Sequence, residues 1–168
     1  MRLCYLYVAI YFKYSYKHFL STFMTKSTRR NSAFRIMLVD DEKDILSTVK
    51  RGLESNNTFK VDTFPSGEAA LQAFENHPEN YYDLVITDIR MPKMNGFELY
   101  RSIKEKNPSM KIAFITAFEI NKEEFNKVMP SVNVIDFISK PVSISNLITK
   151  LKTMLTSGYP QSPASLEL

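Results

Sequence analysis

The sequence has little cysteine and glycine and no tryptophan: 1 cysteine and 4 glycines in 168 residues. Because Cys4 is the single cysteine, no intrachain disulfide can form, and we expect a reducing compartment such as the cytoplasm. The apolar run over residues 3–12 is shorter than the roughly 20 residues that a membrane-spanning helix needs. The hydrophobic content of 44% is nevertheless enough for a buried core, and the length corresponds to one domain with tails.

Acidic residues are absent from residues 1–34, and this segment carries six basic side chains: Arg2, Lys13, Lys17, Lys26, Arg29 and Arg30. The net charge of +4 therefore arises in this segment, and the rest of the chain carries a net charge of −2. No basic patch, aromatic platform or basic recognition helix stands out in that remainder. The sequence therefore argues against direct nucleic-acid binding.

Three interpretations of this basic, aromatic extension stay open. A basic residue followed by a short apolar run imitates a secretory signal, but no small-x-small cleavage site follows it. The tyrosines and lysines could instead form an interfacial anchor. We favour the third interpretation, in which residues 1–23 are not native and the chain starts at Met24 with a short polar leader. In each case we expect residues 1–34 to be poorly ordered, and under the favoured interpretation we expect no membrane contact.

From Arg35 onward, short β-branched runs alternate with segments of helical periodicity, which is typical of a parallel sheet covered on both faces. The strands are expected at residues 36–39, 59–64, 84–87, 112–116 and 134–138. The helices are expected at residues 43–54, 66–76, 96–106, 120–129 and 143–155. This pattern predicts a doubly wound α/β domain over residues 35–156. The remaining tail, 157–168, contains two prolines and little apolar content, so we expect it to be disordered.

Polar side chains follow four of the five expected strands. These side chains are Asp40, Asp41 and Glu42 after the first strand, Asp88 after the third, Thr116 at the end of the fourth, and Ser139 and Lys140 after the fifth. In an open parallel sheet the carboxyl ends of the strands line one crevice, where ligands bind. We therefore expect these side chains to converge.

Carboxylates that face one another in a partly buried crevice repel each other unless protons or a cation lie between them. Mg²⁺ suits this arrangement because it takes one or two carboxylates and leaves room for phosphate oxygens. Asp88 would then be a carboxylate nucleophile able to form an acyl phosphate, and Lys140 would contact the phosphate as a point charge. Catalysis would consist mainly of positioning and charge stabilisation.

Each residue also has an ordinary interpretation when it is taken alone. An Asp-Asp pair after an apolar run is typical of a helix N-terminus. Asp88 could be a loop residue, and a lysine at the end of a strand is usually solvated. Their co-occurrence at the ends of four strands, in a chain with five such units, favours a functional site.

Four stretches together resemble the receiver domains of two-component response regulators, of the CheY-like, stand-alone type. They read IMLVDDE at residues 36–42, DLVITDIRMP at 83–92 with Asn95-Gly96 after it, AFITA at 113–117, and DFISKP at 136–141. The resemblance covers about 120 of the 168 residues in the order that the family has. It implies a flavodoxin-like fold with the strand order 2-1-3-4-5.

The resemblance also implies roles for the acids. Asp88 would be the phosphoacceptor, and Asp41 would be a direct Mg²⁺ ligand. Asp40 would reach the metal mainly through water, and the backbone carbonyl of Arg90 would be a third protein ligand. Gly96, in the loop beside Asp88, would supply backbone conformations that other residues avoid.

For the rest of the site, the resemblance implies a phosphate contact and a switch. Lys140 would contact the phosphate, and its peptide bond to Pro141 would be cis. The Thr116 hydroxyl would move toward the phosphoryl oxygens, and Phe137 would move into the space that Thr116 leaves. Because Phe137 stands where many family members have tyrosine, its readout would depend on packing alone.

The hypothesis is therefore a phosphorylated binding switch that catalyses only its own phosphorylation and dephosphorylation. A histidine kinase or a phosphotransfer protein would supply the phosphate. The face formed by 120–129, 134–138 and 143–155 would then bind an effector protein or a second copy of the chain. One alternative is a degenerate receiver that acts only as an interaction module. The other is a magnesium-dependent aspartyl phosphatase, which needs a general acid where this chain has Arg90.

Overall fold

The apolar runs of the chain form the strands of a single parallel sheet. In this computed structural model, residues 33–55, 57–117, 120, 125, 132 and 135–156 are described. The strands are β1 (Phe34–Val39), β2 (Phe59–Phe64), β3 (Leu84–Asp88), β4 (Ile112–Thr116) and β5 (Phe137–Ser139). They lie in the order β2-β1-β3-β4-β5 and all pair in parallel, which confirms the predicted strand order.

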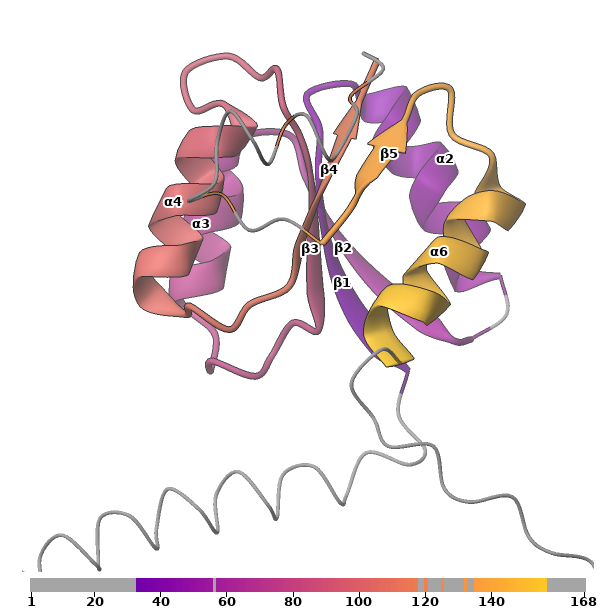
Figure 1. Cartoon of the computed structure of the whole chain (residues 1–168), viewed down its shortest axis with the longest axis horizontal. Helices are drawn as coiled ribbons and strands as arrows, with labels where there is room; N and C mark the ends of the chain where they lie inside the picture. Colours follow the sequence, from indigo (N-terminus) through magenta and orange to yellow (C-terminus); the bar gives the residue numbers. More distant parts are fainter. Residues whose placement is uncertain are drawn as a thin grey trace, which may run out of the picture. The chain divides into compact units, whose positions relative to one another are not determined.

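The helices lie on both faces of this sheet. They are α2 (Lys43–Glu54), α3 (Gly67–Glu75), α4 (Gly96–Lys106) and α6 (Ile144–Thr156). Figure 1 shows α2 and α6 on one side of the sheet and α3 and α4 on the other. Because both faces are covered, every residue of β3 and β4 is buried, as expected for central strands of a doubly wound fold.

The two layers of the core differ in composition. β1 alternates between them: Ile36 and Leu38 face the α2 and α6 side, whereas Met37 and Val39 face the α3 and α4 side. The first layer is mainly aliphatic, and the second contains most of the buried aromatic side chains and methionines. A fully buried Val, Leu, Ile, Phe or Met side chain in either layer contributes about 1.5–3 kcal/mol to the stability of the fold.

Local sequence explains where the helices start. Ser66 caps α3 by accepting a hydrogen bond from the backbone of Ala69. Asn95 and Glu98 form a capping box at the start of α4, in which each side chain accepts from the backbone of the other residue. α2 and α4 have the predicted bounds, and α3 and α6 differ from theirs by one residue at each end.

Three strands differ from the expectation. β3 ends at Asp88, one residue after the predicted end. β1 begins at Phe34, two residues before the predicted start, because the Phe34 amide donates to the Thr58 carbonyl and its ring packs on Phe59. β5 covers Phe137–Ser139 and not 134–138. Residues 135 and 136 form backbone hydrogen bonds with β4 but precede the strand, which extends one residue further because Ser139 pairs with Thr116.

Several predictions concern residues outside the described ranges. The termini, 1–32 and 157–168, are outside them, and so is the expected helix over 120–129 apart from Ile120 and Phe125. Within the described ranges, every helix is too short or too polar to cross a bilayer.

Candidate functional site

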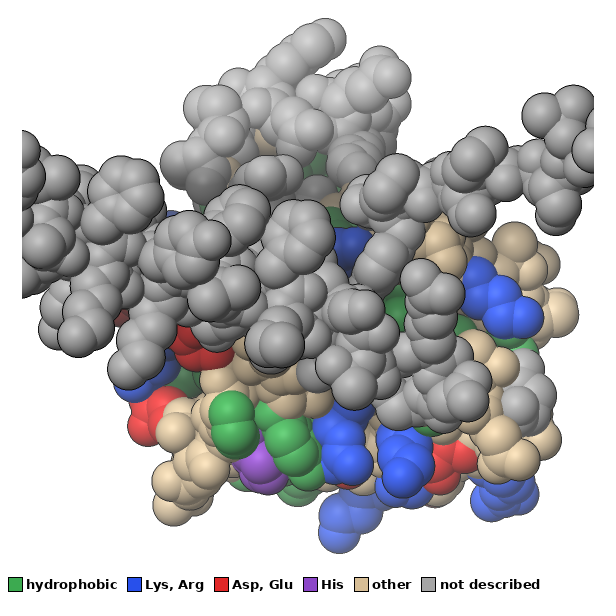
Figure 2. All heavy atoms as spheres, turned by 90° about the horizontal axis from the view of Figure 1, so that it is seen from below, with side chains coloured by type: hydrophobic (Ala, Val, Ile, Leu, Met, Phe, Trp, Pro, Cys, Tyr) green, Lys and Arg blue, Asp and Glu red, His purple; other side chains and the backbone are tan. Residues whose placement is uncertain are grey.

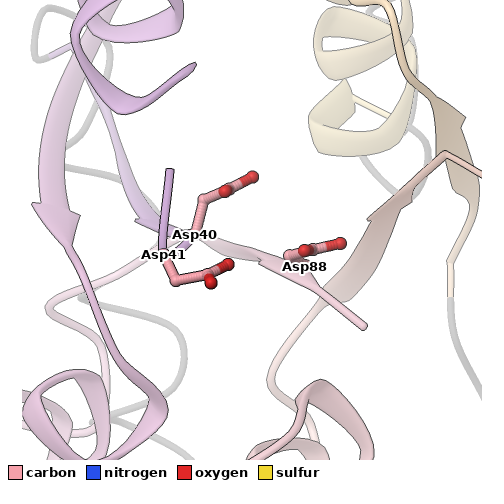
Figure 3. Close-up of side chains that lie close together, drawn as sticks. All are labelled: Asp40, Asp41 and Asp88. Atoms are coloured by element: carbon pink, nitrogen blue, oxygen red, sulfur yellow. The ribbon is translucent and has the colours of Figure 1, made fainter. Parts of the chain in front are cut away.

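Three aspartates meet at the carboxyl edge of the sheet. Asp40 and Asp41 directly follow β1, and Asp88 is the last residue of β3, the neighbouring strand. One carboxylate oxygen from each lies within 4.8 Å of the other two. Figure 3 shows the three side chains converging from the two strand ends. The predicted convergence of acids from separate strands is thus present.

Backbone contacts hold the Asp40 carboxylate in place. The Asp40 amide donates to the Phe64 carbonyl at 3.1 Å, and Asp40 Oδ1 accepts from the Glu42 amide at 3.0 Å. The side chain is fully buried. Among the described residues Oδ2 accepts no hydrogen bond, but it forms an ion pair with Lys140 Nζ at 2.8 Å. This oxygen therefore keeps lone pairs available for a cation.

Asp88 is a buried acid, and its favourable contacts offset only part of the cost of burying its negative charge. Its Oδ1 accepts from the Ile89 amide at 2.8 Å. Burial raises the pKa of the Asp88 carboxyl, Lys140 lowers it, and the neighbouring Asp40 raises it again, so the net shift is upward. The protein alone therefore disfavours the charged form that a nucleophile needs, and a nearby cation would reverse this.

Lys140 lies among these acids. Its amide donates to the Thr116 carbonyl at 2.7 Å, which ties the end of β5 to β4, and its peptide bond to Pro141 is cis as the resemblance implied. Lys140 Nζ lies 2.8 Å from Asp40 Oδ2 and 3.5 Å from Asp88 Oδ2. Burial lowers the pKa of Lys140, but the contacts with Asp40 and other acids outweigh burial and raise it above its usual value.

A third acid contacts the same ammonium. Glu42 Oε1 accepts a hydrogen bond from Lys140 Nζ at 3.1 Å. The sequence placed Glu42 after β1 but offered no role for its side chain. Its position next to the acid pair was the one available signal, and the contact depends on the Lys140 side chain reaching from the end of β5 to the residues that follow β1.

The loop after Asp88 requires a glycine for a reason other than the predicted one. A Cβ at Gly96 would lie 2.2 Å from the Asp88 carbonyl oxygen, so the glycine allows a close backbone approach. The left-handed residue in this loop is Lys93, with φ 65°, beside a hydrogen bond from the Met94 amide to the Pro92 carbonyl. The predicted conformational role of Gly96 is therefore wrong, and its role is steric.

The same loop borders a pocket of about 530 Å³. It is lined by Ile89, Arg90, Met91, Pro92, Asn95 and Phe97. Arg90 thus lies beside the site with its side chain exposed. That its carbonyl binds a metal stays a prediction.

The two predicted switch residues lie on β4 and β5, the two strands beyond β3 in the sheet. Thr116 is buried at the end of β4, and its Cα pairs with that of Ser139. Phe137 is buried among aromatic side chains, where its ring centroid lies 5.8 Å from that of Phe114 and 4.9 Å from that of Phe125. That these two residues act as a switch stays a prediction.

The donor set suits a hard divalent cation. Asp40, Asp41 and Asp88 offer carboxylate oxygens that lie close enough to share one ion. Lys140 carries one positive charge but contacts three carboxylates. The negative charge that remains would be offset by a bound cation. The cluster is therefore compatible with Mg²⁺.

A family model for the response regulator receiver domain matches residues 36–152. The chain belongs to this family. The receiver domain is 31% identical to the response regulator receiver protein CpdR of Brucella abortus over 124 residues, 74% of this chain and 98% of CpdR. It is 28% identical to the transcriptional regulatory protein RprY of Bacteroides fragilis over 121 residues, 72% of this chain and 49% of RprY. The chain thus spans about half the length of some of the curated relatives that it matches.

Solved structures agree with this assignment. The receiver domain protein of Methanospirillum hungatei superposes with a TM-score of 0.65 at 28% identity, over 75% of this chain and 96% of that chain. The chemotaxis protein CheY4 of Vibrio cholerae superposes with a TM-score of 0.65 at 24% identity, over 74% of this chain and all of that chain, and supports the fold. The protein is therefore a response regulator receiver of two-component signalling with a CheY-like fold.

Proposed function

We propose that this receiver domain accepts a phosphoryl group on Asp88 in a reaction that needs Mg²⁺. The observation that carries the proposal is the convergence of three acids and a lysine from three strand ends. The acids lie within 4.8 Å of one another, and Lys140 Nζ lies 3.5 Å from Asp88 Oδ2. A histidine kinase or a phosphotransfer protein would be the donor, and the cytoplasm would be the compartment.

The chemistry follows from the positions of these groups. A carboxylate oxygen of Asp88 attacks the phosphorus of a phosphohistidine, the P–N bond breaks, and the imidazole leaves with the electron pair and takes up a proton. Lys140 holds charge on the transferred phosphoryl oxygens. Asp40, Asp41 and Asp88, with the Arg90 carbonyl, would hold Mg²⁺, which when bound supplies positive charge between the acids and the phosphoryl group.

The output would pass through protein contact. Thr116 is buried at the end of β4, and Phe137 of β5 packs in the layer that contains most of the buried aromatic side chains. A shift of the Thr116 hydroxyl toward the phosphate would change the packing around Phe137. The face around 120–129, β5 and α6 would then bind an effector protein or a second receiver. Because Phe137 has no hydroxyl, this readout depends on its contacts with Phe114 and Phe125.

Intact mass spectrometry tests the proposal directly. The receiver is incubated with acetyl phosphate and Mg²⁺, and we expect the gain of one phosphoryl group. Asp88→Ala should lose this gain, whereas the control Asp44→Ala, which changes an exposed aspartate in the first turn of α2, should keep it. Absence of any gain in the unmodified protein would favour a pure interaction module. Steady release of inorganic phosphate from unrelated phosphomonoesters would favour a phosphatase.

A further inference from the structure

Glu42 covers Lys140 from the solvent side. The Glu42 side chain is 62% exposed, whereas that of Lys140 is 11% exposed, so the carboxylate reaches inward to a largely buried ammonium. Lys140 Nζ is closer to Asp40 Oδ2, at 2.8 Å, and to Glu42 Oε1, at 3.1 Å, than to Asp88 Oδ2, at 3.5 Å. Before phosphorylation, the lysine is therefore held mainly by acids other than the phosphoacceptor.

The Glu42 side chain has no capping role that would explain this position. Glu42 is the N-cap residue of α2, but its side chain forms no capping hydrogen bond. The Glu42 backbone, and not its side chain, makes the local contacts at the start of α2. The Glu42 amide donates to Asp40 Oδ1, and the Glu42 carbonyl accepts from the Leu46 amide. A change of the side chain therefore leaves these contacts intact and alters the contact with Lys140.

The three N–H donors of a lysine limit how many partners it can serve. Asp40, Glu42 and Asp88 each have a carboxylate oxygen within 3.5 Å of Lys140 Nζ, and Glu42 accepts a hydrogen bond from it. A phosphoryl oxygen that pairs with Lys140 therefore competes with these acids. Asp40 is buried and would be left without its partner, whereas Glu42 can turn into water, and an exposed ion pair of this kind is weak.

We infer that Glu42 is a positioning residue that restrains phosphorylation by occupying Lys140 until a phosphoryl group displaces it. This inference rests on the proposed function and adds a determinant of its rate. In the step that is slowed, Asp88 attacks the phosphorus of acetyl phosphate, the P–O bond to the acetyl group breaks, and acetate leaves with the electron pair. Glu42 opposes this step in two ways: it competes for Lys140, and its charge repels the anionic donor.

The test is the rate of phosphorylation of the full chain by acetyl phosphate at saturating Mg²⁺, so that a change in metal affinity does not contribute. We expect Glu42→Gln and Glu42→Ala each to raise the rate by about three- to tenfold, the effect expected of one charge at the edge of the site. Glu105→Gln, which removes an equally exposed acid near the end of α4, should leave the rate unchanged.

Ionic strength separates this role from a merely structural one. Because the restraint is electrostatic, the gain in rate should shrink as salt is raised from about 0.01 M to 1 M. Unchanged or lower rates in both Glu42 variants, beside normal phosphorylation of the unmodified domain, would overturn the inference alone. Failure of the unmodified domain to take up phosphate on Asp88 would remove the proposed function and this inference with it.

Discussion

Charged side chains gather at both ends of the sheet, and the two ends differ in how these charges are matched. At the amino end, the Arg35 amide donates to Asp83 Oδ2, and its guanidinium pairs with Asp62 and lies over the Tyr81 ring. Lys111 adds a second cation there; burial lowers its pKa, and the charge of Asp83 opposes this shift only in part. In the part of this end that Figure 2 leaves visible, basic and acidic side chains lie close together.

At the carboxyl end, three carboxylates share the ammonium of Lys140, and Asp41 adds a fourth acid beside them. The charges at the amino end satisfy one another, as in an ordinary stabilising network. Those at the carboxyl end are in excess and partly buried, and perturbed acids of this kind gather at functional sites. The difference indicates that the carboxyl end, unlike the amino end, can accept positive charge from outside the chain.

Replacing one lysine at each end of the sheet should give the largest difference in the free energy of unfolding. In EDTA, Lys140→Ala should lower the free energy of unfolding by about 3 kcal/mol, because the buried Asp40 loses its partner. Lys111→Ala should lower it by about 1 kcal/mol, because it loses mainly a hydrogen bond to the Met154 carbonyl. Urea denaturation measures both values, and equal losses would contradict the comparison.

Mg²⁺ should stabilise the fold through the acid cluster at the carboxyl end and not through the charged residues at the amino end. A concentration about a hundredfold above its dissociation constant should raise the free energy of unfolding by about 2.7 kcal/mol. Asp41→Asn should abolish most of this gain, because it removes a carboxylate of the cluster. Asp62→Asn, at the amino end, should keep it. Thermal melts in Mg²⁺ and in EDTA provide the measurement, and an equal response of the two variants would break the comparison.

An Asp→Asn change should raise the melting temperature at the carboxyl end and lower it at the amino end. In EDTA at pH 7, Asp88→Asn should raise the melting temperature, because the raised pKa of Asp88 means that its charge destabilises the fold. Asp62→Asn should lower the melting temperature because Arg35 loses its ion pair.

The pH dependence of the Asp88 effect follows from its sign. A carboxyl whose pKa is higher in the folded chain destabilises that state above this pKa and has no such effect once it is protonated in both states. The advantage of Asp88→Asn should therefore shrink once the pH falls below the pKa of Asp88 in the folded domain, and disappear below its pKa in the unfolded chain. An advantage that persists at low pH would point to a cause other than charge.

Local patterns were sufficient for much of the fold. The bounds of α2 and α4 agree with the prediction, because an apolar stripe and, for α4, a capping box at Asn95 and Glu98 define them. The start of β5 was wrong because the apolar run over 134–138 does not indicate which of its residues pair with β4. Pairing across strands depends on partners distant in the sequence, which periodicity does not contain.

The site was predictable in its residues but not in its contacts. Asp40, Asp41, Asp88 and Lys140 could be found because each follows an apolar strand run, and parallel strands end at one edge. The role of Glu42 could not, because its contact joins residues 98 positions apart. The steric role of Gly96 was equally hidden, since it depends on how close the backbone passes to the Asp88 carbonyl.

The sequence by itself determined which residues stand at the strand ends, because alternating apolar runs specify strands and helices locally. Only the tertiary structure decided which atoms the Lys140 side chain reaches from the end of β5, and that three acids surround its ammonium. The physical reason is that electrostatic energy depends on distance and burial, and both arise only when the chain packs.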